Sequence, residues 1–204
     1  AFPLYTGPKD IAEFKPKAFM QVDWSRGGDA IIVKRGINSV NDLKGKKIAV
    51  AVPSPAQTLL MTALEAANLK YTDVEVIKTT DNLKAAQLFR SADVDAAVVW
   101  SPDDILATND VAGSKVLLTT KDQSHVIADI FFAKEDYINA HRKMIDGFYE
   151  GWMKAVAELK ANPSNREKTA KYLGEINGLG TADAMGMMDV VYWTGHGDNL
   201  NFPF

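Results

Sequence analysis

The chain has 204 residues, of which 47% are hydrophobic and 24% are charged; its formal net charge is −3 and it contains no cysteine. This composition predicts a folded chain with a substantial core, in one large domain or two small lobes, and the scattered Lys and Arg argue against nucleic acid as a partner. Without cysteine these residues offer no disulfide, thiolate metal ligand or cysteine nucleophile, and no apolar run reaches the roughly 18 residues that a membrane-spanning helix needs.

The N-terminal part of the chain is rich in proline and glycine and is expected to be mostly loop, although Phe19–Asp23 has the pattern of a short strand. Its first residues lack the basic and apolar segments of a secretory signal peptide, so we expect a mature or trimmed chain. The run Asp29–Lys34 predicts a strand. Ser39 and Asp42 then form an S-x-x-D capping box, which predicts one short helical turn.

Strands and helices are predicted to alternate between Asn41 and Leu106, which is typical of parallel strands joined by crossover helices. The predicted strands are Ile48–Val52, Val74–Ile77 and Val94–Trp100. The first strand runs into Pro53-Ser54-Pro55 and the third into Ser101-Pro102, so a helix is expected to begin after each. Open α/β sheets bind ligands where such strands end, and the two junctions are therefore candidate ligand positions.

Two further strands and a helical region are predicted beyond this lobe. The strands are Lys115–Thr119 and His125–Ala133. Apolar residues at helical spacing predict a long helix over 135–161, shorter helices over 164–173 and 181–192, and then an irregular tail.

The helix start at Ser54 has the features of an anion site. Ser54 is a favourable N-cap, Pro55 suits the first helical position, and Gln57 can reach back to complete a capping box. No carboxylate lies in this first turn, so its free N–H groups and positive dipole end, with Ser54, Gln57 and Thr58 as added donors, suit an anion. The alternative that these residues leave open is an ordinary well-capped helix without a ligand.

The second junction carries the opposite charge. Asp103 and Asp104 occupy the first turn after Ser101-Pro102, where they satisfy the helix dipole and repel an anion. Helix stability alone selects aspartate at such positions, so a structural role is favoured here over contact with the positive end of a ligand.

The sequence around each of three tryptophans predicts a different position, in the core or at a cleft. Trp100 closes an apolar strand beside the second junction, where a core position and a cleft wall are equally compatible with the sequence. Trp24 lies in DWSRGGD, where no apolar periodicity explains it, so a role at a ligand or a cleft edge is favoured. Trp152 lies on the apolar stripe of the long helix and is expected in the core.

No catalytic or metal site is predicted. His125, His141 and His196 are far apart in the sequence and have no histidine or carboxylate at metal-binding spacing. The sequence has no G-x-S-x-G, P-loop or G-x-G-x-x-G motif and no nucleophile with a recognisable base. We therefore expect neither catalysis nor a cofactor.

Several segments resemble the solute-binding proteins of ABC importers for nitrate, sulfonates and taurine, the NMT1/THI5-like family. The resemblance covers about Asp23 to Trp193, and the segments that carry it are SRGGDAIIVKRGI, DLKGKKIAVAVPSPAQTLLMTALEAANL and DNLKAAQLFRSADVDAAVVWSPDDILA. It implies the α/β fold of type 2 periplasmic binding proteins, in which two lobes joined by crossing strands close on a ligand. The implied division is a complete second lobe over 39–124 and a partial first lobe made of 1–38 and 125–204, which contains the hinge strands and C-terminal helices.

The resemblance also implies a function. Proteins of this family bind a small solute without catalysis, pass it to the membrane subunits of an ABC transporter, and work in the periplasm or at the cell surface without inserting into the membrane. Family members normally have further strands and helices before the second lobe and further helix at the end, so this chain looks trimmed at both ends.

The contrast between the two junctions predicts the kind of solute. The Ser54 junction suits an anion, whereas Asp103, Asp104 and Asp29 place negative charge where the resemblance puts the opposite parts of the cleft. Those carboxylates suit a cationic or hydrogen-bond-donating group, so a taurine-like or amino-acid-like zwitterion is favoured over bare nitrate or phosphate. Trp24 or Trp100 is expected to cover its carbons or stack on its ammonium group. The expected ligand-binding residues are Trp24, Ser25, Asp29, Ser54, Gln57, Thr58, Trp100 and Asp103.

Two other functions remain open from the sequence. An enzyme on the same fold, similar to the pyrimidine synthases of thiamin biosynthesis, needs cysteine and histidine clusters that this chain lacks. The effector domain of a LysR-type regulator has a similar fold and length. A helix-turn-helix encoded upstream of Ala1 indicates the regulator, whereas a signal peptide there indicates the exported receptor.

Overall fold

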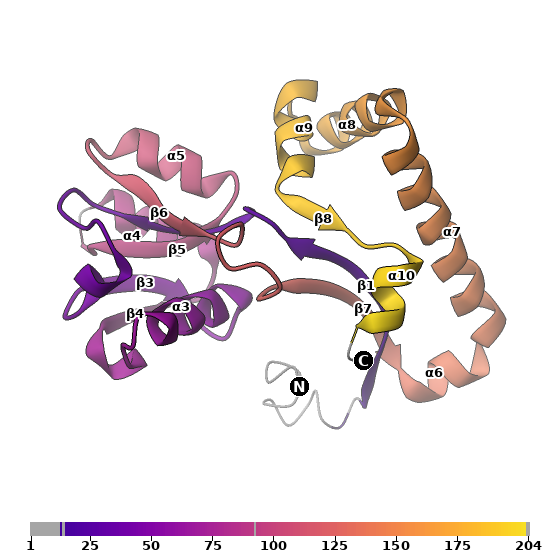
Figure 1. Cartoon of the computed structure of the whole chain (residues 1–204), viewed down its shortest axis with the longest axis horizontal. Helices are drawn as coiled ribbons and strands as arrows, with labels where there is room; N and C mark the ends of the chain where they lie inside the picture. The colour runs from indigo at the N-terminus through magenta and orange to yellow at the C-terminus, as the bar shows by residue number, and fades with distance from the viewer. Residues whose placement is uncertain (1–12, 14, 92, 203–204) are drawn as a thin grey trace. The chain divides into compact units, whose positions relative to one another are not determined.

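The computed structural model describes residue 13, residues 15–91 and residues 93–202. The chain divides into two compact units (Figure 1), the first made of Ala1–Trp24 and Ala128–Phe204 and the second of Ser25–Ile127.

The second unit is built on a five-stranded sheet with the order β4-β3-β5-β2-β6. Its strands are β2 (Asp29–Val33), β3 (Lys47–Ala51), β4 (Glu75–Thr79), β5 (Ala96–Trp100) and β6 (Lys115–Thr119). β3 runs parallel to β4 and β5, which confirms the predicted crossover pattern, whereas β2 runs antiparallel to β5 and β6.

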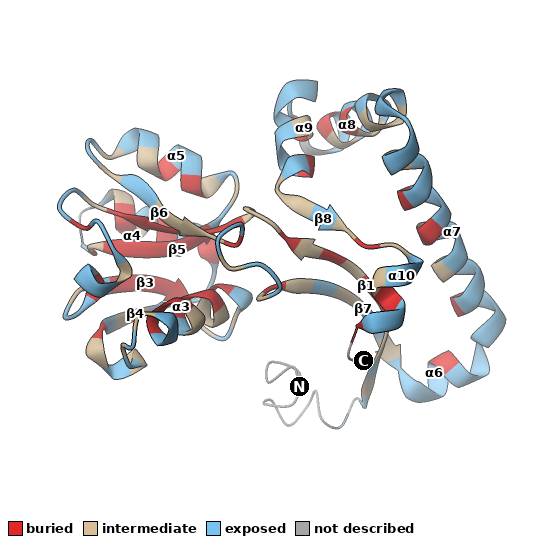
Figure 2. Cartoon of the chain, in the orientation of Figure 1, coloured by how far each residue is buried: buried red, intermediate tan, exposed pale blue. Residues whose placement is uncertain are grey.

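Helices cover both faces of this sheet, because its central strands are buried along their length (Figure 2). The helical elements are η1 (Val40–Leu43), α3 (Pro55–Ala66), η2 (Tyr71–Asp73), α4 (Asn82–Arg90) and α5 (Asp103–Asp110). On the face that packs against α3, the strand residues Ile31, Val33, Ile48, Val50 and Val98 share a core with Leu59 and Leu60 of the helix. On the opposite face, the strand residues Ala30, Ile32, Ala49, Ala97 and Val99 share a core with Phe89 of α4 and Ala107 of α5. The strand residues of the two cores alternate along each strand, because successive side chains of a strand point to opposite faces of the sheet.

The boundary between the units corrects the expected one. Residues 1–38 are expected in the first lobe, but β2 lies between β5 and β6, so the chain from Ser25 onward belongs to the second unit. This unit also extends to Ile127 rather than ending at 124. The physical reason is the pairing of β2 with β5, a partner far along the chain that local periodicity does not reveal.

The strand directions bring several chain segments to one edge of this sheet. β3, β4 and β5 are parallel, so their carboxyl ends share an edge, and α3, α4 and α5 begin there. β2 begins at the same edge, with Asp29 opposite Trp100, and β6 ends there, with Thr119 opposite Ala30. We call this the carboxyl edge.

The first unit has a three-stranded sheet with the order β7-β1-β8. Its elements are β1 (Pro16–Ser25), β7 (Ala128–Lys134), α6 (Glu135–Ala140), α7 (Arg142–Ala161), α8 (Pro163–Asn177), α9 (Thr181–Asp189), β8 (Val191–Trp193) and α10 (His196–Asn201). The single helix expected over 135–161 is interrupted at His141, whose φ of −122° is not helical. The helix expected over 181–192 ends at Asp189, and β8 follows it. The tail expected to be irregular, from Trp193 onward, contains the last residue of β8 and α10. In the described part of the chain, no helix is both long and apolar enough to span a membrane.

Aromatic side chains join the sheet of the first unit to α7. The ring of Phe131 in β7 lies 5.1 Å from that of Phe148 and 5.7 Å from that of Trp152 between centroids. Trp152 also lies 6.4 Å from Trp193 of β8. Trp152 therefore packs α7 against the sheet, as its place on the apolar stripe of the helix predicts.

One amide side chain continues the pairing of β1 beyond β8. The Gln21 N–H donates to Oδ1 of Asn199 at 2.8 Å, and Nδ2 of Asn199 donates back to the Gln21 carbonyl at 3.1 Å. The Thr194 hydroxyl donates to the same carbonyl at 2.7 Å. Gln21 is 1% exposed and Asn199 is 6% exposed, so these bonds satisfy backbone groups that water does not reach.

Replacing this amide tests its contribution to stability. Asn199→Ala leaves the buried Gln21 N–H without its side-chain partner, so we expect the free energy of unfolding to fall by about 1–3 kcal/mol. Asn201→Ala is the matched control, because Asn201 is an exposed residue of the same helix whose amide donates to a carbonyl within α10. Urea unfolding followed by circular dichroism measures both; equal losses in the two variants would contradict the assignment.

Candidate functional site

α3 begins at the carboxyl edge with an uncovered first turn. Ser54 is its N-cap residue and Pro55 its first residue, as predicted, and no acidic residue lies in the first turn. The predicted capping box does not form: the Ser54 hydroxyl donates to the Ala51 carbonyl at 2.7 Å, and the Gln57 amide donates to the Tyr71 hydroxyl at 3.5 Å. No described side chain therefore caps this helix, and its positive end is open at the edge.

Gln57 and Thr58 lie in this first turn and are partly exposed. Burial raises the pKa of Tyr71, so its phenol stays protonated at neutral pH and holds the Gln57 amide beside the helix start. A hydrogen bond of 3.5 Å is weak, and an anionic acceptor can replace it.

The start of α4 is covered by its own carboxylate. Asp81 is the N-cap residue and accepts a hydrogen bond from the Lys84 N–H at 2.8 Å, and the Thr80 hydroxyl donates to it at 2.8 Å. These hydrogen bonds hold the pKa of Asp81 below its ordinary value, because they favour the charged form. This helix start therefore does not attract a second anion.

The start of α5 also carries negative charge. Pro102, and not Ser101, is the N-cap residue, and the Ser101 hydroxyl donates to Oδ1 of Asp104 at 3.0 Å. Asp104 is 5% exposed and is held by that hydroxyl, whereas Asp103 is partly exposed. Asp103 is thus the carboxylate of α5 that a solute can reach.

Trp100 is the last residue of β5, and its side chain is exposed at the carboxyl edge. Its side chain is 42% exposed, which excludes the core position that the sequence left open. Asn82, the first residue of α4, is buried; in the amide orientation that satisfies both neighbours, it accepts from the backbone N–H of Trp100 at 3.0 Å and donates to the Val98 carbonyl at 3.3 Å. The start of α4 is thereby fixed to the end of β5.

Ser25 and Asp29 meet Thr120 where the chain enters β2. The Ser25 hydroxyl donates to Oδ2 of Asp29 at 2.7 Å and lies 2.7 Å from the Thr120 hydroxyl. Ser25, Asp29 and Thr120 are 6%, 7% and 0% exposed. Ser25 is therefore a buried support, and only a small part of Asp29 reaches the surface.

The structure brings the predicted binding residues together at the carboxyl edge, with the exception of Trp24. Trp24 lies in β1 of the first unit, where its ring packs 5.7 Å from that of Phe202 between centroids. Thr120 and Asn82 also lie at this edge, although the sequence does not predict them as site residues. The only signal for them is that each is a short polar residue close behind a predicted strand.

Metal binding has no support among the described residues, where no group of three His, Cys, Asp or Glu side chains could hold an ion. His125 lies 3.3 Å from the Arg26 guanidinium, and His196 pairs with Glu150 at 3.2 Å. The histidines thus take part in separate local contacts.

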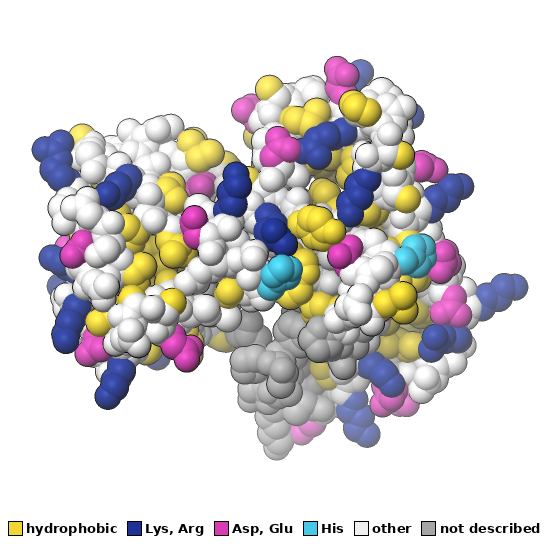
Figure 3. Space-filling view, viewed as in Figure 1, with side chains coloured by type: hydrophobic (Ala, Val, Ile, Leu, Met, Phe, Trp, Pro, Cys, Tyr) yellow, Lys and Arg dark blue, Asp and Glu magenta, His cyan; other side chains and the backbone are white. Residues whose placement is uncertain are grey.

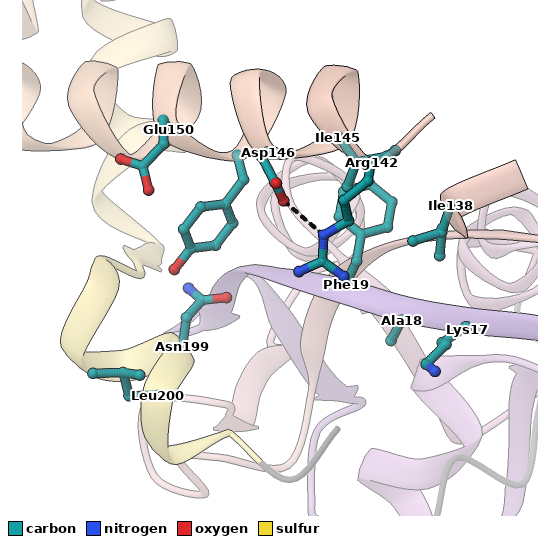
Figure 4. A pocket seen from close by; sticks show the side chains of 11 residues that line it. Lys17, Ala18, Phe19, Ile138, Arg142, Ile145, Asp146, Glu150, Asn199 and Leu200 are labelled. Atoms are coloured by element: carbon teal, nitrogen blue, oxygen red, sulfur yellow. Dashed lines mark hydrogen bonds and ion pairs between the residues drawn. The ribbon is translucent and has the colours of Figure 1, made fainter. Parts of the chain in front are cut away.

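A pocket of about 490 Å³ lies in the first unit between β1, α7 and α10 (Figure 4). None of the predicted binding residues lines it. The cations of its lining have carboxylate partners: Arg142 bonds Asp146 at 3.0 Å, and Lys17 bonds Glu135 at 2.9 Å. The carboxyl edge, where a helix start lacks such a partner, is therefore the stronger candidate for an anionic group.

Charges of both signs are mixed over the visible surface. Figure 3 shows Lys and Arg side chains interspersed with Asp and Glu on that face. A nucleic-acid interface needs a continuous basic surface, so the face in view does not support one.

The chain matches the family model described as NMT1/THI5 like over residues 28–166. It is 25% identical to the taurine-binding periplasmic protein of Escherichia coli (strain K12) over 167 residues, which make up 78% of this chain and 51% of that protein. The chain thus spans about half the length of this relative.

Solved structures show the same fold. The alkanesulfonate-binding protein SsuA from Xanthomonas axonopodis pv. citri, bound to MOPS, is similar with a TM-score of 0.74 and 21% identity over 94% of this chain and 65% of that one. The desulfurization enzyme DSZB is similar with a TM-score of 0.59 and 15% identity over 91% of this chain and 67% of that one. A binding protein and an enzyme thus share the fold, and the fold by itself does not decide between them.

The Asp81 cap predicts a stability difference that depends on pH. Asp81→Ala removes the acceptor of the Lys84 N–H, so we expect a lower urea midpoint at neutral pH. Because the pKa of Asp81 is lowered in the folded state, the wild-type advantage is present at neutral pH and is lost as the pH falls through that lowered pKa. Asp81→Asn keeps a capping oxygen without the charge, so it should remain stable with little pH dependence. An advantage over Asp81→Ala that persists at the acid end of the titration would show that the charge is not its source.

Proposed function

Because the chain belongs to the NMT1/THI5-like family, we propose that it is a non-catalytic solute-binding protein for ABC-transporter uptake, with a small sulfonate-like zwitterion as its ligand. The family resemblance and the type 2 periplasmic-binding fold expected from the sequence are both confirmed. Support for the solute class comes from a relative named for taurine and a neighbour solved with MOPS, two compounds that each carry a sulfonate and an amine.

The observation that carries the proposal is the charge contrast between the helices that begin at the carboxyl edge. α3 starts without a carboxylate, so its N–H groups and dipole attract an anion. α4 starts at Asp81, and α5 starts at Asp103 and Asp104. The proposal therefore places a sulfonate at α3 and an ammonium group toward Asp103 and the accessible part of Asp29.

The remaining residues of the edge have roles in this arrangement. Gln57 and Thr58 donate to the sulfonate, and the exposed ring of Trp100 covers the carbons. The Ser54 hydroxyl contributes only if it turns away from the Ala51 carbonyl. Trp24, which packs on Phe202, is not included.

A bare inorganic anion fits this edge less well than a zwitterion. Two unit charges of the same sign 4 Å apart repel by about 4 kcal/mol near a protein surface and by about 1 kcal/mol in bulk water. An inorganic anion at α3 offers no positive group to Asp103 or Asp29. An ammonium group on the same ligand turns this repulsion into attraction.

We further propose that the solute is passed to the membrane subunits of an ABC transporter, and that the protein works in the periplasm or at the cell surface. The support is the name of the taurine-binding relative, which is a periplasmic protein. The absence of cysteine is compatible with that compartment.

Catalysis is the second candidate, because an enzyme such as DSZB has the same fold. A serine nucleophile must be accessible and must lie within hydrogen-bond reach of a base. Ser25 is buried, the Ser54 hydroxyl donates to a backbone carbonyl, and the Ser101 hydroxyl donates to Asp104 at a helix start. These hydroxyls have structural partners, which favours binding without turnover.

Calorimetry with taurine on the full chain tests the proposed ligand geometry. We expect Gln57→Ala and Asp103→Asn each to weaken binding by about 1–3 kcal/mol, because each removes a hydrogen bond to a charged group. Gln87→Ala in α4 and Asp110→Asn at the far end of α5 change the same residue types away from the carboxyl edge. These matched controls should bind as the wild type does.

Two results of this experiment would remove the zwitterion geometry. One is unchanged taurine affinity in both edge variants. The other is tight binding of nitrate or phosphate by the wild-type chain.

Turnover is tested by incubating taurine or MOPS with the full chain and recovering the ligand for mass spectrometry. We expect both compounds to return chemically unchanged, because Ser25 is buried and the hydroxyls of Ser54 and Ser101 are held by structural hydrogen bonds. A heat-denatured sample of the same protein is the control. A new product that forms only with the folded protein would establish catalysis instead.

A further inference from the structure

Thr120 directly follows β6 at the carboxyl edge and has 0% exposure. A hydroxyl that water does not reach must find its hydrogen-bond partners within the protein. Those partners come from the segment Ser25–Asp29, which leads into β2. Thr120 thus connects two segments of the edge that are far apart in the sequence.

The hydrogen bonds around Thr120 have a defined direction. The Gly27 N–H donates to Oγ1 of Thr120 at 2.8 Å, and the Asp29 N–H approaches the same atom at 3.4 Å. The Ser25 hydroxyl has one hydrogen, which it donates to Oδ2 of Asp29. Thr120 must therefore donate its own hydrogen to Oγ of Ser25, 2.7 Å away. The chain of hydrogen bonds runs from Gly27 through Thr120 and Ser25 to the Asp29 carboxylate, and each bond polarises the next.

Backbone geometry fixes the same turn. Gly27 has a φ of 118°, which a residue with a side chain rarely adopts, so the direction of its N–H is built into the turn. The Thr120 N–H donates to the Asp29 carbonyl at 3.0 Å, and the Ser101 N–H donates to the Gly28 carbonyl at 2.8 Å. The turn that carries Asp29 is therefore bonded both to the end of β6 and to the junction that carries Asp103.

We propose that Thr120 is a positioning residue for the ligand, which directs the Ser25 hydroxyl onto Asp29 and so fixes the carboxylate that meets the ligand's positive end. The inference rests on the proposed function for its ligand. The hydrogen-bond chain itself belongs to the protein without ligand, and it is measurable separately.

The hydroxyl of Thr120, rather than its shape, performs this role. Valine has nearly the same shape, so Thr120→Val keeps the packing but leaves the Gly27 N–H without its acceptor and Ser25 without its donor. Thr120→Ser keeps the hydroxyl and loses one methyl group. The two variants therefore separate hydrogen bonding from packing.

Amide hydrogen exchange in the full chain without ligand tests the hydrogen-bond chain. We expect the Gly27 amide to exchange at least about 10-fold faster in Thr120→Val than in the wild type, with amides in the middle of β2 unchanged. Thr120→Ser should restore the slow exchange. An unchanged rate for Gly27 in Thr120→Val would overturn the proposal.

Calorimetry with taurine then tests the effect on the ligand. We expect Thr120→Val to weaken binding about 10-fold and Thr120→Ser to bind nearly as the wild type does. If Thr120 acts through Asp29, Thr120→Val has little further effect in an Asp29→Asn background, so the two substitutions are not additive. Additive losses would show a merely structural role and overturn the proposal.

The proposal can still be tested if Thr120→Val does not fold or if the wild-type chain does not bind taurine. If Thr120→Val does not fold, Ser25→Ala breaks the next link of the chain and should lower the taurine affinity in the same non-additive way with Asp29→Asn; full affinity in Ser25→Ala overturns the proposal. If the wild-type chain binds no taurine, the proposed function fails for that solute. The exchange of the Gly27 amide then still decides whether Thr120 fixes the turn.

Discussion

The antiparallel pairing of β2 with β5 is the constraint on which the carboxyl edge depends. The parallel strands β3, β4 and β5 bring only helix starts to this edge. The reversed strand β2 adds its own first residue, so that Asp29 lies opposite Trp100, and it allows β6 to end at the same place with Thr120. One strand that runs against its neighbours thus supplies the edge with a buried carboxylate and the hydroxyls that hold it.

Elements that depend on neighbouring residues could be predicted from the sequence. The apolar run that ends at Trp100 and the helix start at Ser54-Pro55 both lie where local patterns place them. The side-chain bonds at the same points could not be predicted, because folding supplies their partners. Ser54 turns to the Ala51 carbonyl and Gln57 to Tyr71, so the helix keeps the uncovered start on which the proposed ligand position depends.

Features that depend on residues far apart in the chain could not be predicted from local sequence patterns. The partners of β2 lie far along the chain, which is why the predicted lobe boundary fell after β2 rather than before it. Thr120 reads as an ordinary loop residue until its complete burial is seen. Trp24 packs on Phe202, which comes from the other end of the chain. No local pattern around Trp24 could therefore reveal this contact.

The Asn199 amide affects how strongly the first unit tends to aggregate while it folds. An open strand edge recruits strands from other molecules, and such pairing starts aggregation. The Asn199 amide binds both the backbone N–H and the backbone carbonyl of Gln21, the two groups with which a strand from another molecule would pair. Since α10 comes much later in the chain than β1, this part of the strand stays open to neighbouring molecules until α10 docks. The yield of folded protein should therefore fall as chains become more crowded during refolding.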